Sequence, residues 1–151
     1  MFKRRARILF LDPGAGTRAR MAEAWCLALG GDWVEPHVAR LRNGAPDPDL
    51  VAVMAERGTP AQAEAVPPWT AQREGGWDLV VPLELGTGED WEAMLEGRRA
   101  KFWDLTADCP PMPGREAPVD LRRCRDGLRE LVDGLVGGFR LKAREDAGDA
   151  G

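Results

Sequence analysis

A short apolar run that ends in a glycine-rich turn is the feature that most constrains the fold of this chain. Ile8–Leu11 is continuously apolar, which is typical of a strand buried on both faces of a parallel sheet. The loop Asp12-Pro-Gly-Ala-Gly-Thr-Arg18 follows directly, and an amphipathic helical pattern then runs from Thr17 to Leu29. A strand, a tight loop and a helix in this order predict the first unit of an α/β fold, with the loop at the carboxyl end of its strand.

The remainder of the chain predicts an alternation of strands and helices. The expected strands are 33–39, 77–83 and 101–103, and the expected helices are 48–57, 90–95 and 121–139, with a long loop containing one short helical turn at 59–76. Pro36 lacks an N–H group, so an edge of the sheet or a bend suits its strand better than a central position. We predict one α/β domain over 1–141, a doubly wound four-stranded parallel sheet with flanking helices, and a flexible tail at 142–151.

The composition excludes several classes of protein. The chain has 151 residues, 44% apolar and 30% charged, which fits one globular domain. Its net charge of -4 is opposite to that of a nucleic-acid binder, so no nucleic-acid partner is expected. The apolar run at 8–11 is too short for a signal-peptide core or a membrane span, so we expect a cytoplasmic protein without a membrane partner.

The three cysteines do not form a ligand pattern. Cys26, Cys109 and Cys124 are far apart, and His37 is the single histidine, so no metal site and no cofactor are predicted. In a cytoplasmic protein these thiols are expected to be reduced. Cys26 and Cys124 lie on apolar helical faces and are interpreted as core residues, whereas Cys109 lies in a loop.

The loop after the first strand is the candidate site. Its backbone N–H groups and the following helix end would converge on an anion, and Arg18 would add a guanidinium fork. Neither a third glycine nor a Gly-Lys-Ser/Thr ending is present, which argues against nucleotide binding. Trp69, in the long loop, is expected to flank the site. The predicted anion-binding residues are Gly14, Ala15, Gly16, Thr17 and Arg18.

The segment ILFLDPGAGTRARMAEAW resembles the opening of the low-molecular-weight protein tyrosine phosphatases and of the thioredoxin-coupled arsenate reductases that share their fold. It is similar to their first strand, Cys-x5-Arg oxyanion loop and following helix. VEPHVARL, DPDLVAVMAERG, WDLVVPL and FWDLTAD are similar to later segments, of which the last bears the general acid. The resemblance implies the phosphatase fold. It places Arg18 as the loop arginine, Asp12 at the position of the nucleophilic cysteine, and Asp104 or Asp108 as the acid, with Asp108 favoured.

The departures from this family concern its chemistry. In the family a thiolate attacks the phosphorus or arsenic, while loop amides and the arginine stabilise the charge and an aspartic acid protonates the leaving group. Here Asp12 replaces the thiolate, Ala15 and Ala19 replace the usual supporting side chains, and Pro13 removes one N–H donor. The further thiols of the arsenate reductase relay are also absent around Val81–Leu83.

We therefore expect a catalytically inactive relative that acts as a binding or regulatory module with a remnant oxyanion loop. Its partner would be a phosphate-like anion or a protein, and Asp12 would itself accept loop N–H bonds and pair with Arg18. One alternative is a phosphomonoesterase in which Asp12 forms an aspartyl-phosphate. In that case Gly14 replaces the second carboxylate needed to hold Mg²⁺. The other is a structural or assembly protein that uses exposed tryptophans and the long C-terminal helix.

Overall fold

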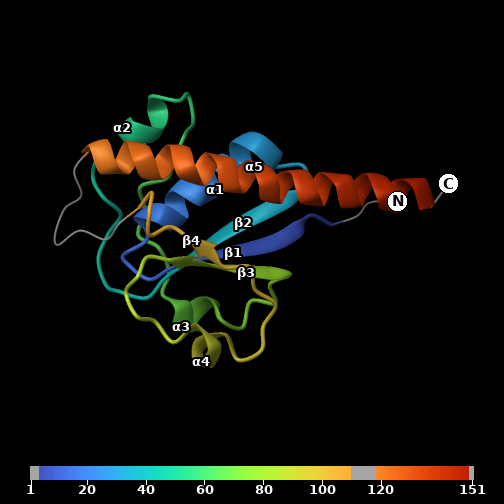
Figure 1. The fold of residues 1–151 in the computed structure, drawn as a ribbon, viewed down its shortest axis with the longest axis horizontal. Coiled ribbons are helices and arrows are strands. Elements are labelled where there is room, and N and C mark those ends of the chain that lie inside the picture. Colours follow the sequence, from blue (N-terminus) through green and yellow to red (C-terminus); the bar gives the residue numbers. More distant parts are fainter. Residues whose placement is uncertain (1–3, 110–117, 150–151) are drawn as a thin grey trace.

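A four-stranded parallel sheet forms the centre of the molecule, as the sequence predicts. The structure is a computed structural model that describes residues 4–109 and 118–149. The strands are β1 (Ala6–Asp12), β2 (Val34–Arg40), β3 (Leu79–Glu84) and β4 (Trp103–Asp104), in the spatial order β2-β1-β3-β4. Figure 1 shows this sheet with helices packed above and below it. The predicted α/β fold class is confirmed.

The apolar run at 8–11 forms the middle of β1, which has a neighbour on each side. Phe10 is level with Val38 of β2 and with Val81 of β3. All four side chains of the run have no solvent exposure, because helices cover both faces of the sheet. Ile8 and Phe10 belong to the larger core, and Leu9 and Leu11 belong to the smaller core on the other face.

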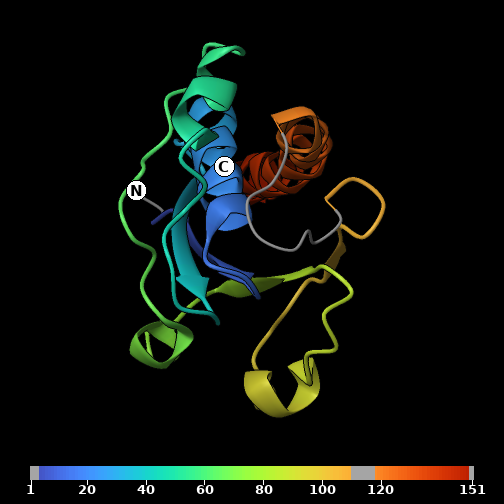
Figure 2. The ribbon, with the colours of Figure 1, turned by 90° about the vertical axis from the view of Figure 1, so that its left-hand side faces the viewer.

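The helices form one layer on each face of the sheet (Figure 2). One layer contains α1 (Thr17–Gly30), α2 (Leu50–Ala55) and α5 (Pro118–Asp149), and the other contains α3 (Trp69–Gln72) and α4 (Trp91–Leu95). A Cβ atom on Gly30 would overlap the side chain of Val136, so the absence of a side chain there allows α1 and α5 to approach closely. No helix in the described part of the chain has the length and apolarity needed to span a bilayer.

Several elements differ in detail from the expectations. The strand containing Pro36 does lie at an edge of the sheet. Trp69, expected to flank the site, begins α3 and is buried in the smaller core, to which Leu9 and Leu11 also belong. The tail expected at 142–151 is helical through Asp149. Its alanine, lysine, arginine and glutamate residues have high helix propensity, and extending an existing helix is far easier than starting one.

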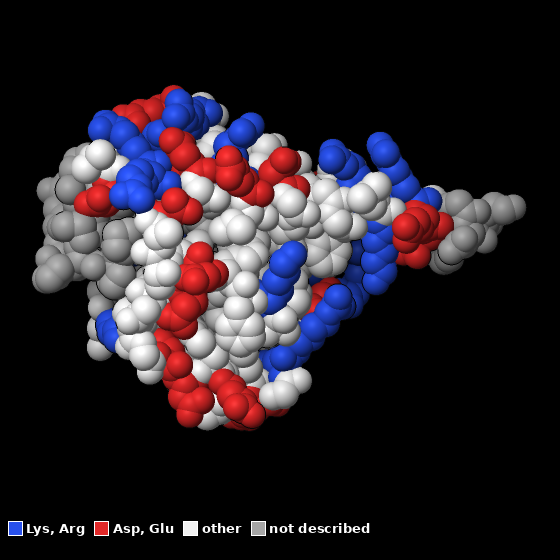
Figure 3. Space-filling view, in the orientation of Figure 1, with Lys and Arg blue, Asp and Glu red and all other residues white. Residues whose placement is uncertain are grey.

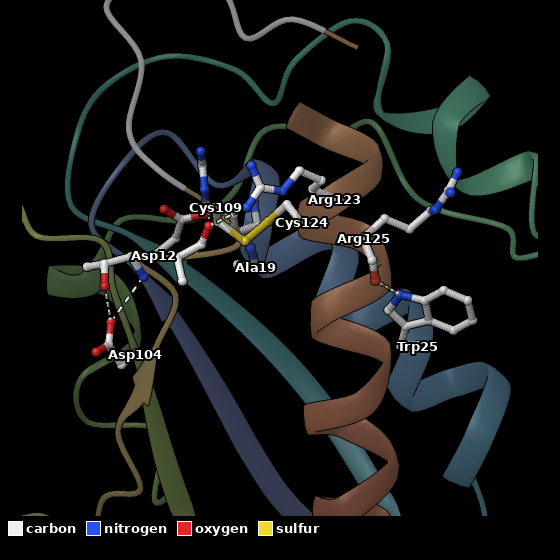
Figure 4. The surroundings of a disulfide bond; sticks show 11 residues. Asp12, Ala19, Trp25, Asp104, Cys109, Arg123, Cys124 and Arg125 are labelled. Carbon is white, nitrogen blue, oxygen red and sulfur yellow. Dashed lines mark hydrogen bonds between the residues drawn. A yellow bond between two sulfur atoms is a disulfide. The ribbon is translucent and has the colours of Figure 1, made fainter. Parts of the chain in front are cut away.

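The expectation that all three cysteines are reduced is wrong for two of them. Cys109 and Cys124 form a disulfide, which joins the loop after β4 to the first part of α5 (Figure 4). Both residues are buried, and their separation of 15 positions placed them in different predicted elements. Only the fold brings them together. Cys26 is free and buried in α1, and burial raises the pKa of its thiol to about 12.

The disulfide should contribute measurably to stability. Closing a loop over the 15-residue separation removes chain entropy from the unfolded state, worth about 3 kcal/mol. We expect tris(carboxyethyl)phosphine to lower the urea midpoint of the wild type by a corresponding amount, and the Cys109→Ala/Cys124→Ala variant to show the lower midpoint with or without reductant. Cys26→Ala should keep the sensitivity to reductant. If the unreduced, denatured wild type exposes three titratable thiols rather than one, the disulfide is absent.

An ionic network joins α2 to α5. Arg125, which is almost fully buried, donates to the Val53 carbonyl at 2.9 Å and to Glu56 at 2.7 Å, and Arg122 also binds Glu56 at 2.7 Å. Asp126 accepts from Arg125 at 2.8 Å and from the residue that follows Glu56, Arg57, at 3.1 Å. The bonds from Arg122 and Arg125 lower the pKa of Glu56 to about 2, and those from Arg125 and Arg57 lower the pKa of Asp126 to about 2.

This network predicts a loss of stability in acid. Both carboxyl groups have folded-state pKa values below their ordinary values of 4.5 and 3.8, so their contribution is present above those values and is lost as pH falls toward about 2. We expect Glu56→Gln/Asp126→Asn to be less stable than the wild type at neutral pH and to converge with it in acid. Glu145→Gln is the control. Urea unfolding across this pH range measures the difference, and a difference independent of pH would contradict the assignment.

Candidate functional site

The loop between β1 and α1 lies at the carboxyl end of the central strand, where ligands of open parallel sheets usually bind. Gly16 has φ 114°, a conformation that favours glycine, and a Cβ atom there would overlap the side chain of Val66. The backbone of the loop is therefore held in a tight turn that glycine alone fits well. This turn aims the first N–H groups of α1 back toward the end of β1.

Asp12 fills the centre of this turn with its own carboxylate. The side chain has no solvent exposure. One carboxylate oxygen accepts from Gly14 N at 2.8 Å, and the other accepts from Arg18 N at 3.0 Å and from Ala19 N at 3.1 Å. Arg18 and Ala19 are the second and third residues of α1, whose N-cap, Gly16, offers no side-chain bond. Asp12 therefore caps α1 and places a carboxylate at its positive end.

The expected hydrogen bonds from the loop to Asp12 are thus present. The N–H groups of Ala15, Gly16 and Thr17 are not among the donors to its carboxylate. Arg18 donates to the Asp12 carboxylate through its backbone N–H, and the Arg18 side chain is buried.

Arg42, which the sequence analysis did not single out, ties the loop to two neighbouring segments. Its side chain donates to the Pro13 carbonyl at 2.8 Å and to Glu89 at 3.2 Å, and its backbone N–H donates to Gly14 O at 3.1 Å. Thr17 Oγ1 also accepts from Asp47 N at 2.9 Å. The position of Arg42 just after a strand was a usable signal, because the carboxyl ends of parallel strands meet at one edge of the sheet.

Of the two candidate general acids, Asp104 is the last residue of β4 and Asp108 lies in the loop that follows, and neither forms a described hydrogen bond or ion pair with Asp12. Asp104 accepts from Thr106 N at 3.0 Å and from Thr106 Oγ1 at 2.6 Å, and these bonds lower the pKa of Asp104 (Figure 4). A lowered pKa favours the ionised form, which is unsuited to a general acid. The Asp108 side chain packs within 3.0 Å of the position that a Cβ atom on Gly127 of α5 would occupy.

The disulfide and one arginine fasten this acid-bearing loop to α5. Cys109 is bonded to Cys124, and Arg123 donates to the Ala107 carbonyl at 2.8 Å (Figure 4). The loop is therefore held against the helix on both sides of Asp108. Among the described residues there is no group of three or more His, Cys, Asp or Glu side chains that could hold a metal ion.

No protein-family model matches the chain, and no curated protein matches its sequence. Solved structures do match. An arsenate reductase in the phosphate-binding state is 18% identical with a TM-score of 0.73, covering 89% of this chain and 98% of its own. The YwlE arginine phosphatase, a mutant with a phosphorylated active-site serine, is 20% identical with a TM-score of 0.70, and the match covers 89% of this chain and 95% of that one. A low-molecular-weight protein tyrosine phosphatase from Bacillus subtilis is 20% identical with a TM-score of 0.65, and the match covers 87% of this chain and 95% of that one.

The chain has the fold of the low-molecular-weight phosphatases and arsenate reductases. The fold implied by the sequence resemblance is confirmed. At these identities the structural likeness establishes the architecture, and the roles of Asp12, Arg18 and Asp108 rest on the sequence resemblance.

Removing the Asp12 carboxylate should destabilise the protein. Asp12→Ala leaves three N–H groups without their acceptor, and hydrogen bonds to a charged group contribute about 1.5–3 kcal/mol. We expect a loss of this size in the free energy of urea unfolding, with a smaller loss for Asp12→Asn, which keeps one acceptor oxygen. Asp133→Ala, an exposed aspartate on α5, is the control for net charge and should be neutral. An Asp12→Ala variant as stable as the wild type would show that these bonds contribute nothing.

Proposed function

We propose that this protein is a catalytically inactive relative of the low-molecular-weight phosphatases that serves as a binding or regulatory module. The observation that carries the proposal is the set of three N–H bonds to the buried Asp12 carboxylate. These donors are of the kind that would otherwise hold an anion at the amino end of α1. The loop is an oxyanion cradle occupied by the protein's own side chain.

The environment of Asp12 argues against a catalytic role for it. A nucleophile must be able to reach the phosphorus atom, whereas the Asp12 carboxylate has no solvent exposure and three backbone N–H bonds hold it in place. An aspartyl-phosphate route would also need carboxylates to hold Mg²⁺, and Gly14 stands at the position where the second one is expected. Asp104, the exposed candidate acid, has a lowered pKa that disfavours proton donation.

The same carboxylate favours a protein partner over a free anion. A phosphate-like dianion approaching the loop would meet the negative charge of Asp12, with the N–H groups of Gly14, Arg18 and Ala19 already engaged. The loop is therefore suited to keeping the fold intact without admitting substrate. In this proposal the outer surface of the domain, and not the loop, binds the partner protein.

The decisive experiment compares phosphate binding by the wild type and by Asp12→Ala. We expect Asp12→Ala to bind inorganic phosphate at least tenfold more tightly in isothermal titration, since the mutation removes the repulsion and frees three donors, a change worth about 1.4 kcal/mol or more. Phosphate should then restore part of the stability lost by the variant. Asp133→Ala, with the same change in net charge, should bind phosphate no better than the wild type.

The wild type should not hydrolyse p-nitrophenyl phosphate above the rate of a heat-treated sample, with or without Mg²⁺. Turnover abolished by Asp12→Ala would overturn the inactive assignment. If the wild type binds phosphate as tightly as Asp12→Ala does, Asp12 does not occupy the anion position and the self-occupied loop is wrong.

A further inference from the structure

A hollow lies at the end of the sheet opposite to Asp12. It is a cavity of about 440 Å³ between the C-terminal half of α5 and the segment Arg99–Lys101, which leads into β4. Leu79, which lines it, begins β3 and is level with Ile8 near the start of β1. The cavity is thus at the amino ends of the strands, separate from the oxyanion loop. We call it the basic groove.

The basic groove combines an apolar wall with three cations. Leu79, Leu135 and Phe139 supply apolar surface, and Arg99, Lys101 and Lys142 surround it, with no acidic residue in the lining. Within residues 4–109 and 118–149, none of these three cations forms an ion pair. Other arginines close by do: Arg4 pairs with Asp78, and Arg98 pairs with Glu74. In a chain of net charge -4, three cations without an ion pair thus gather on the lining of one groove.

The wall formed by α5 carries glycines where side chains would close the groove. Gly134 and Gly138 are one helical turn apart and both line the cavity. A Cβ atom at either position would meet nothing within 4 Å, so packing against the rest of the chain does not require glycine there. Glycine destabilises a helix relative to alanine, yet these two positions leave the groove open.

We propose that the basic groove binds a small amphipathic anion, with its apolar body against Leu135 and Phe139 and its carboxylate, sulfonate or phosphate head at Arg99, Lys101 and Lys142. The volume falls within the range of small-molecule sites, about 300–1,000 Å³. Basic side chains gather along the flank of the molecule beneath the projecting end of α5 (Figure 3). The groove therefore offers the apolar contact and the charge that such a ligand needs together.

An adjoining cavity of about 400 Å³ indicates which way the ligand lies. It shares Arg99, Phe139 and Lys142 with the basic groove. Its other charged residues include Asp32 and the ion pair of Arg4 with Asp78, in which a guanidinium nitrogen lies 2.7 Å from a carboxylate oxygen. Since opposite charges are mixed there, the anionic head belongs on the Lys101 side.

The test uses two chemically distinct amphipathic anions and matched substitutions on α5. Anilinonaphthalene sulfonate binding is followed by fluorescence and decanoate binding by isothermal titration, with uncharged decanol as the control for the head group. Gly138→Leu fills the groove, whereas Gly137→Leu places the same side chain on the same helix away from the lining, again with no atom within 4 Å of its Cβ. Lys142→Glu reverses a lining charge, and Arg144→Glu reverses an exposed charge outside the lining.

We expect both anions to bind the wild type, and Gly138→Leu and Lys142→Glu each to weaken binding about tenfold or more, which corresponds to about 1.4 kcal/mol. Gly137→Leu and Arg144→Glu should bind like the wild type, and decanol should bind more weakly than decanoate. Failure of both anions to bind, or equal weakening by Gly137→Leu and Gly138→Leu, would overturn the proposal. A dimer in sedimentation that Gly138→Leu dissociates would instead make the groove an interface between two copies, and would also overturn it.

Discussion

The capping of α1 by the Asp12 carboxylate is the interaction on which the arrangement of the sheet's carboxyl edge depends. A buried carboxylate costs free energy unless it is fully hydrogen-bonded, and the first N–H groups of a helix are equally costly to bury without acceptors. Here each satisfies the other, with three bonds between 2.8 and 3.1 Å. The tight turn at Gly16 and the contacts of Arg42 with the loop support this cap, because both hold the backbone in the shape that makes these bonds possible.

The sequence predicted those parts of the fold that local pattern determines. The buried run at 8–11, the edge position of the strand with Pro36 and the acceptor role of Asp12 could all be derived because each depends on neighbouring residues and simple backbone chemistry. The disulfide between Cys109 and Cys124, and the burial of Trp69 beneath the sheet, could not. Both depend on how distant segments pack. The spacing of these residues in the sequence does not predict which other residues they will contact. Arg42 falls between the two cases, since its position after a strand was visible but its contacts were not.

The two ends of the sheet divide the chemistry of the molecule between them. At the carboxyl end the Asp12 carboxylate accepts N–H bonds from the loop, and at the amino end Arg99, Lys101 and Lys142 line a groove without an ion pair among the described residues. α5 connects the two regions, because it begins near the disulfide and passes over the sheet to the groove. Its close contact with α1 at Gly30 and Val136 fixes its position between them.

The bond between Cys109 and Cys124 also changes what a broken backbone would mean for this protein. The two sulfur atoms span the stretch of chain between the sheet and its longest helix. A peptide bond hydrolysed at any point within that stretch would leave two fragments that are still covalently joined, each retaining its part of one core. The nicked molecule would separate into two pieces only after reduction, because the sulfur atoms would still hold α5 to the rest of the protein where the main chain no longer connects it.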